Sequence, residues 1–493
     1  MGKKGSDAVT GYKYHFGIHM GLSRGPLDTV SEIRVGDKPA WYGFANDTGP
    51  LDVRAPDLFG GDKQEGGIDG TGVLMMGKPD QVADPGLVAM LGHALPGFRR
   101  MATYFFNGAI ASNSPYPKPW KFRVTRRLKG WDGDVWYPEK CTIDLQGDPI
   151  IDELGNPVMG TGAIQAMNPA HIIYELLTNR EWGRGLPASA LNLASFAAAA
   201  DTLYDEGFGL CLRWNRRDSL ESFLQSVADH IGAVLYSDRS TAQLTLKLIR
   251  FDYDPNTLPI YDVSSGLLEI RESNVSALGP AVNEIVVEYF DPVSAKVRTV
   301  ANQNIASLQA TRGVFNSLKK TYNGVSTSSL ALRLAQRDLR THAMALRKFT
   351  MTFDRRAWKI APGSVMRIAD PVRGISNVIV RVGRIEDGTL TDGTITITAV
   401  QDVFALPNTS FIGNEPPNWV KPNNKPILKE HRAFEVPYFL LNQTMRPADF
   451  AILPEDAGFL GTVVAKPSDL SLAYNLFVKN GPATPDEQPP STP

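Results

Sequence analysis

Ser23 lies in the segment Gly21-Leu22-Ser23-Arg24-Gly25, which matches the G-x-S-x-G pattern of a nucleophilic serine. That pattern requires a helix directly after the serine, so that the hydroxyl stands exposed on a strained turn. Here Pro26 follows instead, and the next apolar residues, Ile33 and Val35, alternate as in a strand. We therefore interpret Ser23 as part of an ordinary β-turn.

Asp252 and Asp254 flank Tyr253 and form a second candidate for catalysis. Two carboxylates facing one sugar would suit glycoside hydrolysis. However, Asp254-Pro255-Asn256 is also a common start of a turn, and no aromatic-lined sugar cleft accompanies the pair. The turn is the interpretation we favour.

Metal and phosphate sites are weakly signalled. His15 and His19 have a spacing that suits metal binding on a helix, but on a strand they would lie about 13 Å apart, too far for one metal. The glycine-rich segment 60–72 lacks the GxxxxGK(S/T) pattern of a phosphate-binding loop and does not begin a helix. Cys141 and Cys211 are too far apart in sequence for a CxxC zinc motif or a disulfide framework. We expect no metal, no cofactor and no enzymatic activity.

Two groups of basic residues follow the periods of a strand and of a helix. Segment 121–129 alternates basic residues with Phe122, Val124 and Leu128, which predicts a strand with one basic and one apolar face. On an expected helix from 328 to about 347, arginines lie opposite a leucine stripe. These faces could be solvated, pair with a neighbouring subunit, or contact nucleic acid. The candidates are Lys121, Arg123, Arg127, Lys129, Arg333, Arg337, Arg340 and Arg347.

Length and composition set the frame for these residues. A chain of 493 residues suggests about three domains, and 43% apolar with 21% charged residues excludes wholesale disorder. The net charge of −1 argues against a dedicated binder of nucleic acid or anionic membranes. We expect no signal peptide and no membrane span, because the polar N-terminus and short apolar stretches suit neither. Gly2 with Ser6 matches the loose myristoylation pattern by chance, and two cysteines fit a reducing compartment.

The expected elements are strands at both ends of the main body and helices at its centre, an α+β, β-rich chain. Asn168-Pro169 begins one helix, a second runs over about 193–206, and a third starts at Asp218 and ends at Gly232. After the long helix from 328, four strands follow at 349–353, 364–369, 378–385 and 394–400. The expected organisation is a β-rich domain over 1–160, central α+β domains over 161–406, a Pro/Asn-rich linker over 407–426, a small β domain over 427–480, and a Pro-rich tail or linker over 481–493.

A set of short segments in a shared order resembles a known family. The N-terminal part contributes Gly11–Gly17, Ser23–Asp28, Gly36–Trp41, Leu58–Gly67 and Ser114–Trp120. The central part contributes Thr178–Pro187, Ile249–Asp254, Asn283-Glu284, Ala335–Arg340 and Gln401–Phe404. Together, over about residues 11–475, they resemble the tail-tip and baseplate-hub family of siphophages, which includes the tip attachment proteins of lambda-like phages and the hub of gene transfer agents.

The resemblance implies tandem hub-type β-barrel domains with a few packed helices, assembled as a homotrimer. It further implies a structural hub in the virion, at the distal end of the tail of a long-tailed bacteriophage, that closes the tail tube and opens for DNA ejection. The implied partners are the distal tail protein or tail-tube ring, the C-terminus of the tape measure protein, and other tail-tip and fibre proteins, with phage DNA in transit. Assembly would take place in the bacterial host cytoplasm, and the basic faces would lie at trimer seams or the channel wall.

Two alternatives belong to other functional classes. A tail-associated cell-wall hydrolase would need Ser23, or Asp252 with Asp254, to gain convergent partners in space. A host-receptor binding module would require the isolated chain to adsorb to cells.

Overall fold

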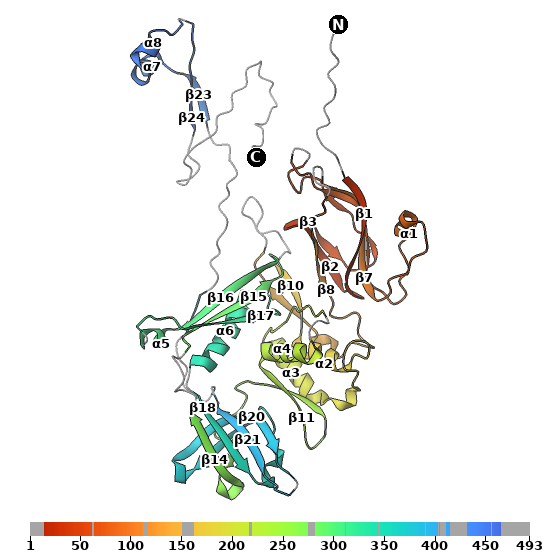
Figure 1. The fold of residues 1–493 in the computed structure, drawn as a ribbon, viewed down its shortest axis with the longest axis vertical. Coiled ribbons are helices and arrows are strands. Elements are labelled where there is room, and N and C mark those ends of the chain that lie inside the picture. The colour runs from red at the N-terminus through yellow and green to blue at the C-terminus, as the bar shows by residue number, and fades with distance from the viewer. Residues whose placement is uncertain are drawn as a thin grey trace. The chain divides into compact units, whose positions relative to one another are not determined.

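The computed structural model describes residues 14–61, 64–111, 116–149, 162–215, 219–274, 282–310, 312–343, 346–389, 391–402, 404, 411–414, 431–454 and 456–464. In this part the chain is β-rich with packed helices, which confirms the predicted α+β class. It forms two compact units, residues 1–417 and 418–493 (Figure 1). No helix among the described residues is long and apolar enough to cross a membrane.

The N-terminal lobe, residues 14–125, consists of two sheets around one apolar core. The strand on which His15 and His19 were considered corresponds to β1. Tyr104 and Phe106 of β7 are fully buried, because alternate side chains of a strand point to the same face. One sheet has the order β1 (Tyr14–Arg24), β7 (Met101–Ala111), β6 (Ile68–Met75) and β4 (Gly49–Pro50), with β5 (Val53–Ala55) also paired to β6; the other contains β3 (Lys38–Ala45), β2 (Thr29–Val35) and β8 (Trp120–Thr125).

Helix α1 (Pro85–Leu91) of this lobe is absent from the sequence-based prediction. Its start signal is present, since Asp84 accepts a hydrogen bond from the Leu87 backbone and Pro85 occupies the first helical position. Seven residues are too few to establish a helical period, so the pattern did not reveal it.

The central lobe, residues 131–250 and 284–343, packs helices against small sheets around a second core. The helices are α2 (Pro169–Thr178), α3 (Leu193–Asp205), α4 (Leu220–Ile231), α5 (Ile305–Ala310) and α6 (Ser328–Ala343), with 3₁₀ turns at Pro138–Lys140 and Ala188–Ala190. Two of its sheets have two strands each, β9 (Thr142–Gln146) with β10 (Ala163–Met167) and β11 (Ala233–Ser237) with β12 (Leu244–Leu248). The third sheet has the strand order β17 (Ser317–Tyr322), β15 (Glu284–Asp291), β16 (Lys296–Asn304) and β22 (Phe411–Asn414).

The predicted helices α2, α3 and α4 are confirmed, whereas the start of α4 and the end of the predicted long helix, α6, differ from the prediction. Asn168 caps α2 as expected, and Gly232 ends α4 in a left-handed conformation. The cap of α4 is Ser219, whereas the predicted start, Asp218, lies outside the described residues. Helix α6 ends at Ala343, so the prediction that it reaches Arg347 is wrong.

Residues 260–274 and 347–401 form one six-stranded sheet that curls into a half-barrel around a third core. All four strands predicted at this end of the main body are present. The order is β13 (Ile260–Tyr261), β19 (Val365–Asp370), β20 (Ile375–Asp387), β21 (Ile395–Gln401), β18 (Arg347–Phe353) and β14 (Leu267–Asn274), with 3₁₀ turns at Val263–Ser265, Arg355–Lys359 and Pro371–Arg373.

The second unit contains β23 (His431–Glu435), α7 (Tyr438–Thr444), α8 (Pro447–Phe450) and β24 (Leu460–Val464). The two strands pair antiparallel. Within the range 427–480 of the expected small β domain, the described residues form a hairpin with two short helices between its strands. In the expected linker over 407–426, Phe411–Asn414 is strand β22, while the tail at 481–493 lies outside the described residues.

Candidate functional site: an arginine joint and a charged groove

Of the residues considered for catalysis, Asp254 starts a turn and Ser23 lies near the end of strand β1, paired with Ala102. Ser23 Oγ donates a hydrogen bond to the backbone oxygen of Arg24 at 3.2 Å. A carboxylate oxygen of Asp254 accepts a hydrogen bond from the backbone of Asn256 at 2.9 Å. The Asp254 bond agrees with the turn interpretation of its segment, whereas the turn expected at Ser23 is wrong, because β1 continues through Ser23 to Arg24.

The histidines of β1 lie on one side of their sheet, and the helix-bearing segment 77–101 covers part of it. The His19 ring meets the Phe98 ring edge-to-face at 4.7 Å, and burial lowers the pKa of His19. His15 is exposed. Among the described residues, no group of three His, Cys, Asp or Glu side chains is placed to hold a metal.

The basic residues of segment 121–129 mostly bond within the chain. The strand ends at Thr125, not at residue 129, and its apolar side chains Phe122 and Val124 pack on the N-terminal core as expected. Lys121 pairs with Asp37 at 3.0 Å, and Lys129 donates to the backbone oxygen of Asn46.

Arg123 and Arg127 reach across to the β9–β10 hairpin of the central lobe. Arg123 donates to the backbone oxygen of Ala163 at 2.8 Å, and burial lowers its pKa. The guanidinium of Arg127 is buried and donates to Thr142 Oγ1 and Gln165 Oε1 at 3.0 and 2.9 Å. The predicted basic face thus meets another lobe of the same chain at these two positions.

Four more arginines make the same kind of contact, and sequence reasoning missed them. Arg34 donates to the backbone oxygens of Val293 and Ser294 at 2.8 and 3.2 Å. Arg126 forms an ion pair with the buried Glu175 of α2 at 2.6 Å. Arg24 and Arg100 both pair with Glu181.

We call these six residues the arginine joint: Arg24, Arg34, Arg100, Arg123, Arg126 and Arg127. Every donor lies in the N-terminal lobe or the segment directly after β8, and every acceptor named above lies in the central lobe. The buried apolar side chains form separate clusters on the two sides of the joint. The two lobes are therefore connected by directed polar bonds between two independent cores.

Arg347 and the α6 arginines lie elsewhere. Arg347 begins β18, and its guanidinium lies over the Phe349 ring at 5.1 Å. Arg333, Arg337 and Arg340 line a groove of about 1540 Å³ together with α4 and the end of β21. The helix therefore presents three of its four predicted basic residues to this groove.

Internal partners neutralise much of the groove. Arg337 donates to the His230 backbone oxygen at 2.8 Å and to the Asp338 carboxylate at 3.0 Å. Although burial opposes ionisation, Arg337, Tyr322 and Lys320 hold the pKa of Asp338 below its usual value. Arg333 donates to the backbone oxygen of Glu206. The groove is thus lined by a connected network of hydrogen-bonded groups that carry charges of both signs.

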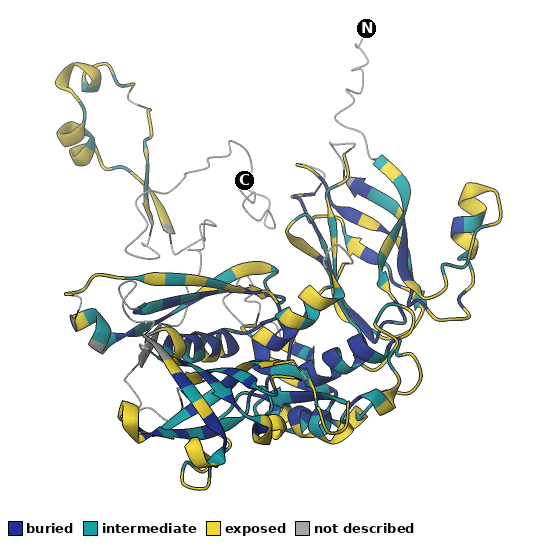
Figure 2. Ribbon diagram, turned by 60° about the horizontal axis from the view of Figure 1, so that its bottom comes forward, coloured by how far each residue is buried: buried dark blue, intermediate teal, exposed yellow. Residues whose placement is uncertain are grey.

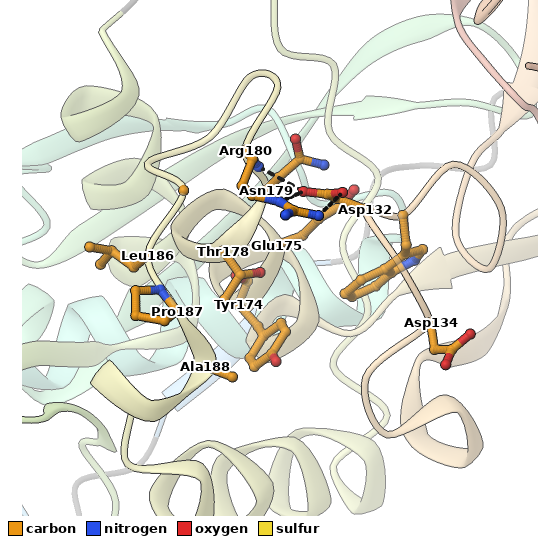
Figure 3. A pocket seen from close by; sticks show the side chains of 12 residues that line it. Asp132, Asp134, Tyr174, Glu175, Thr178, Asn179, Arg180, Leu186, Pro187 and Ala188 are labelled. Atoms are coloured by element: carbon orange, nitrogen blue, oxygen red, sulfur yellow. Dashed lines mark hydrogen bonds and ion pairs between the residues drawn. The ribbon is translucent and has the colours of Figure 1, made fainter.

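A smaller pocket of about 360 Å³ lies at the end of α2 (Figure 3). Arg180 forms a two-pronged ion pair with Asp132, and this lowers the pKa of Asp132 to about 2. The side chain of Tyr174 also lines it. The pair ties the segment after α2 to the segment before the first 3₁₀ turn, next to Glu181 of the joint.

Comparisons with known proteins agree with this architecture. Residues 219–385, from α4 through most of β20, match a family described as a putative phage tail protein. The predicted resemblance to phage tail proteins is thereby confirmed. A search of curated protein sequences gave no match.

A search of solved structures gave matches of low sequence identity. A chain in the virion of a native gene transfer agent particle is 14% identical, with 79% of this chain and 78% of that chain covered and a TM-score of 0.50. A tail protein from Neisseria meningitidis MC58 is 10% identical, covering 76% and 96%, with a TM-score of 0.32. The 43 kDa tail protein of prophage MuSo2 from Shewanella oneidensis is 11% identical, covering 76% and 98%, with a TM-score of 0.28. The family match supports a role as a phage tail protein.

Proposed function

We propose that the chain is a baseplate hub or tail-tip protein that closes the distal end of a phage-type tail tube and opens when DNA leaves. The observation that carries the proposal is the family match over α4 to β20, in the part of the chain that contains the groove and the half-barrel. The fold shared with a chain of the gene transfer agent virion supports it.

The proposed assembly is a homotrimer in contact with the distal tail protein or tail-tube ring, the tape measure protein and other tail-tip proteins. The role needs no catalysis, which is consistent with the positions of Ser23 in strand β1 and of Asp254 at a turn. Among the candidate basic residues, Lys121 and Arg333 remain well exposed beside their ion-pair partners. We propose that these two face a neighbouring subunit or the channel.

Immunogold electron microscopy of intact virions tests the location. Antibody raised against the purified chain should place gold at the distal end of the tail, while antibody against the major capsid protein marks the head as a control. Gold along the tube, on the head, or on no particle would contradict the hub.

Light scattering of the purified chain tests the trimer. The expected mass is three times that of one chain. A monomer at every concentration examined would contradict the proposed symmetry even if the gold marks the tail tip.

A further inference from the structure

The C-terminal module, defined as residues 431–464, lacks a core of its own. No described side chain in it is buried, and seven of its large apolar side chains are between 40 and 79% exposed (Figure 2). They are Phe434, Tyr438, Phe439, Leu440, Ile452, Leu460 and Val463. Such a concentration of exposed apolar residues in so short a segment is typical of an interaction surface.

A module of this size is not stable alone. A single two-stranded hairpin is marginal in water, and helices of seven and four residues are too short to add stability without packing. The Tyr438 and Phe450 rings meet edge-to-face at 4.8 Å, but both rings keep solvent contact. The module must therefore bury its apolar side chains against something else.

Helix α7 indicates that a partner on one side of the module cannot bury all of its apolar side chains. Its first four residues, Tyr438-Phe439-Leu440-Leu441, are all apolar. Successive residues of a helix are turned by about 100°, so these four side chains point in all directions around the axis. A helix that is apolar all round is normally buried all round. A flat partner surface would leave half of this turn in water, whereas a cluster of modules would enclose it.

The two faces of the hairpin are complementary to each other. Paired residues of an antiparallel sheet share a face, and alternate residues take opposite faces. Arg432 and Phe434 therefore share one face with Val463, and Glu435 shares the other face with Leu460. Each face offers apolar side chains and one charge, and the two charges are opposite in sign. The first face of one module can thus pack on the second face of another, with Arg432 directed toward Glu435.

We propose that the occupant of these surfaces is a second copy of this chain, and that the modules of neighbouring copies pack face to opposite face in a closed ring. Contacts between two different faces generate a ring when the rotation closes. Residues 415–430 separate β22 from β23, so each module can reach about 55 Å from the edge of its own sheet. Within one oligomer that reach gives a high effective concentration of modules. The inference rests on the proposed oligomeric hub and extends it to a named surface.

Hydrogen exchange of the full-length chain tests the ring. The amides of residues 438–444 should exchange about tenfold more slowly when the chain concentration is raised through the association range. In Glu435→Arg and in Arg432→Glu the protection should be lost, because like charges then meet across each contact. The double variant Arg432→Glu/Glu435→Arg should regain it. Asp449→Arg, an exposed charge change in α8, is the matched control and should keep the protection.

Two results would overturn the proposal. Protection that does not depend on chain concentration would mean that the module docks on its own chain. Absence of protection at every concentration would mean that a different protein covers it. Light scattering and gold labelling distinguish the failure of the ring from the failure of the hub. A trimer with unprotected modules would refute the ring but not the hub. Gold away from the tail would refute the hub but not the ring.

Discussion

The clearest test of the arginine joint is Arg34→Ala. The Arg34 side chain is 11% exposed and pairs at 2.5 Å with Glu32, whose side chain is 4% exposed. The same guanidinium donates to the backbone oxygens of Val293 and Ser294 in the central lobe. Alanine removes the donor that serves all three of these acceptors. It leaves the Glu32 carboxylate buried beside Tyr42.

The expected cost follows from what is left behind. Removing one partner of a buried ion pair costs about 3–5 kcal/mol, because the other charge stays desolvated. Burial, together with the charge of Glu32, raises the pKa of Tyr42 to about 12, so Tyr42 stays a neutral donor that offsets part of the loss. We therefore expect about 3 kcal/mol. At about 2–4 °C per kcal/mol for a domain of this size, the first unfolding transition should fall by about 6–12 °C.

Thermal unfolding followed by circular dichroism measures this effect. The matched control is Arg54→Ala, which removes a surface arginine paired with Asp52 and Asp69 and should cost less than about 1 kcal/mol. The double variant Arg34→Ala/Glu32→Gln should recover part of the loss, since no charge is then stranded. If Arg34→Ala unfolds at the same temperature as Arg54→Ala, the bonds of Arg34 to Glu32, Val293 and Ser294 do not stabilise the chain as described.

Three further outcomes follow from buried polar groups. Burial lowers the pKa of His171 to about 4, so the stability from keeping it neutral is fully present above its unfolded pKa of about 6.5 and is lost as pH falls toward 4. The free energy of unfolding, measured with urea, should fall by about 3 kcal/mol for this reason in the native chain as the pH is lowered, and His171→Gln should lack this fall. An equal dependence of the free energy of unfolding on pH in the two proteins would contradict the prediction. Gln81 bonds the Gly77 amide and the backbone oxygens of 97, 98 and 101, so Gln81→Leu should speed tryptic cleavage within 97–101 severalfold, and an unchanged rate would refute its role. Asp402→Asn leaves the buried Arg381 unpaired and should cost about 3 kcal/mol by urea unfolding, more than any exposed Asp→Asn change.

The elements that the sequence predicts well are those whose signals are local. Asn168-Pro169 and Gly232 set helix ends through their own hydrogen bonds and backbone angles, so no distant residue can change the outcome. The end of α6 is different, because Arg347 continues the helical period and also begins the alternation of β18. Pairing of β18 with β14 and β21 on both sides decides in favour of the strand, and that pairing is not visible in a local pattern.

The same reasoning explains which part of the candidate site was predictable. Alternation in 121–129 shows which side chains share a face, but it does not show what covers that face. Arg123 bonds the backbone oxygen of Ala163, forty positions away, and a backbone acceptor leaves no trace in residue type. Arg34 could be suspected from its i, i+2 spacing to Glu32 on one strand face, yet its other partners lie some 260 positions away.

A joint made of arginine donors differs physically from a shared apolar core. Separating two cores that are already closed exposes little new apolar surface, so the opposing free energy is mainly that of the polar bonds. The ion pairs of Glu181 with Arg24 and Arg100 are partly exposed and are screened by salt, whereas the pair of Arg126 with Glu175 is largely buried and is screened much less. The lobes should therefore loosen first at Glu181 and last at Glu175. For the proposed hub, this order places the start of any opening on the side of the joint that carries Glu181, next to the Arg180–Asp132 pair.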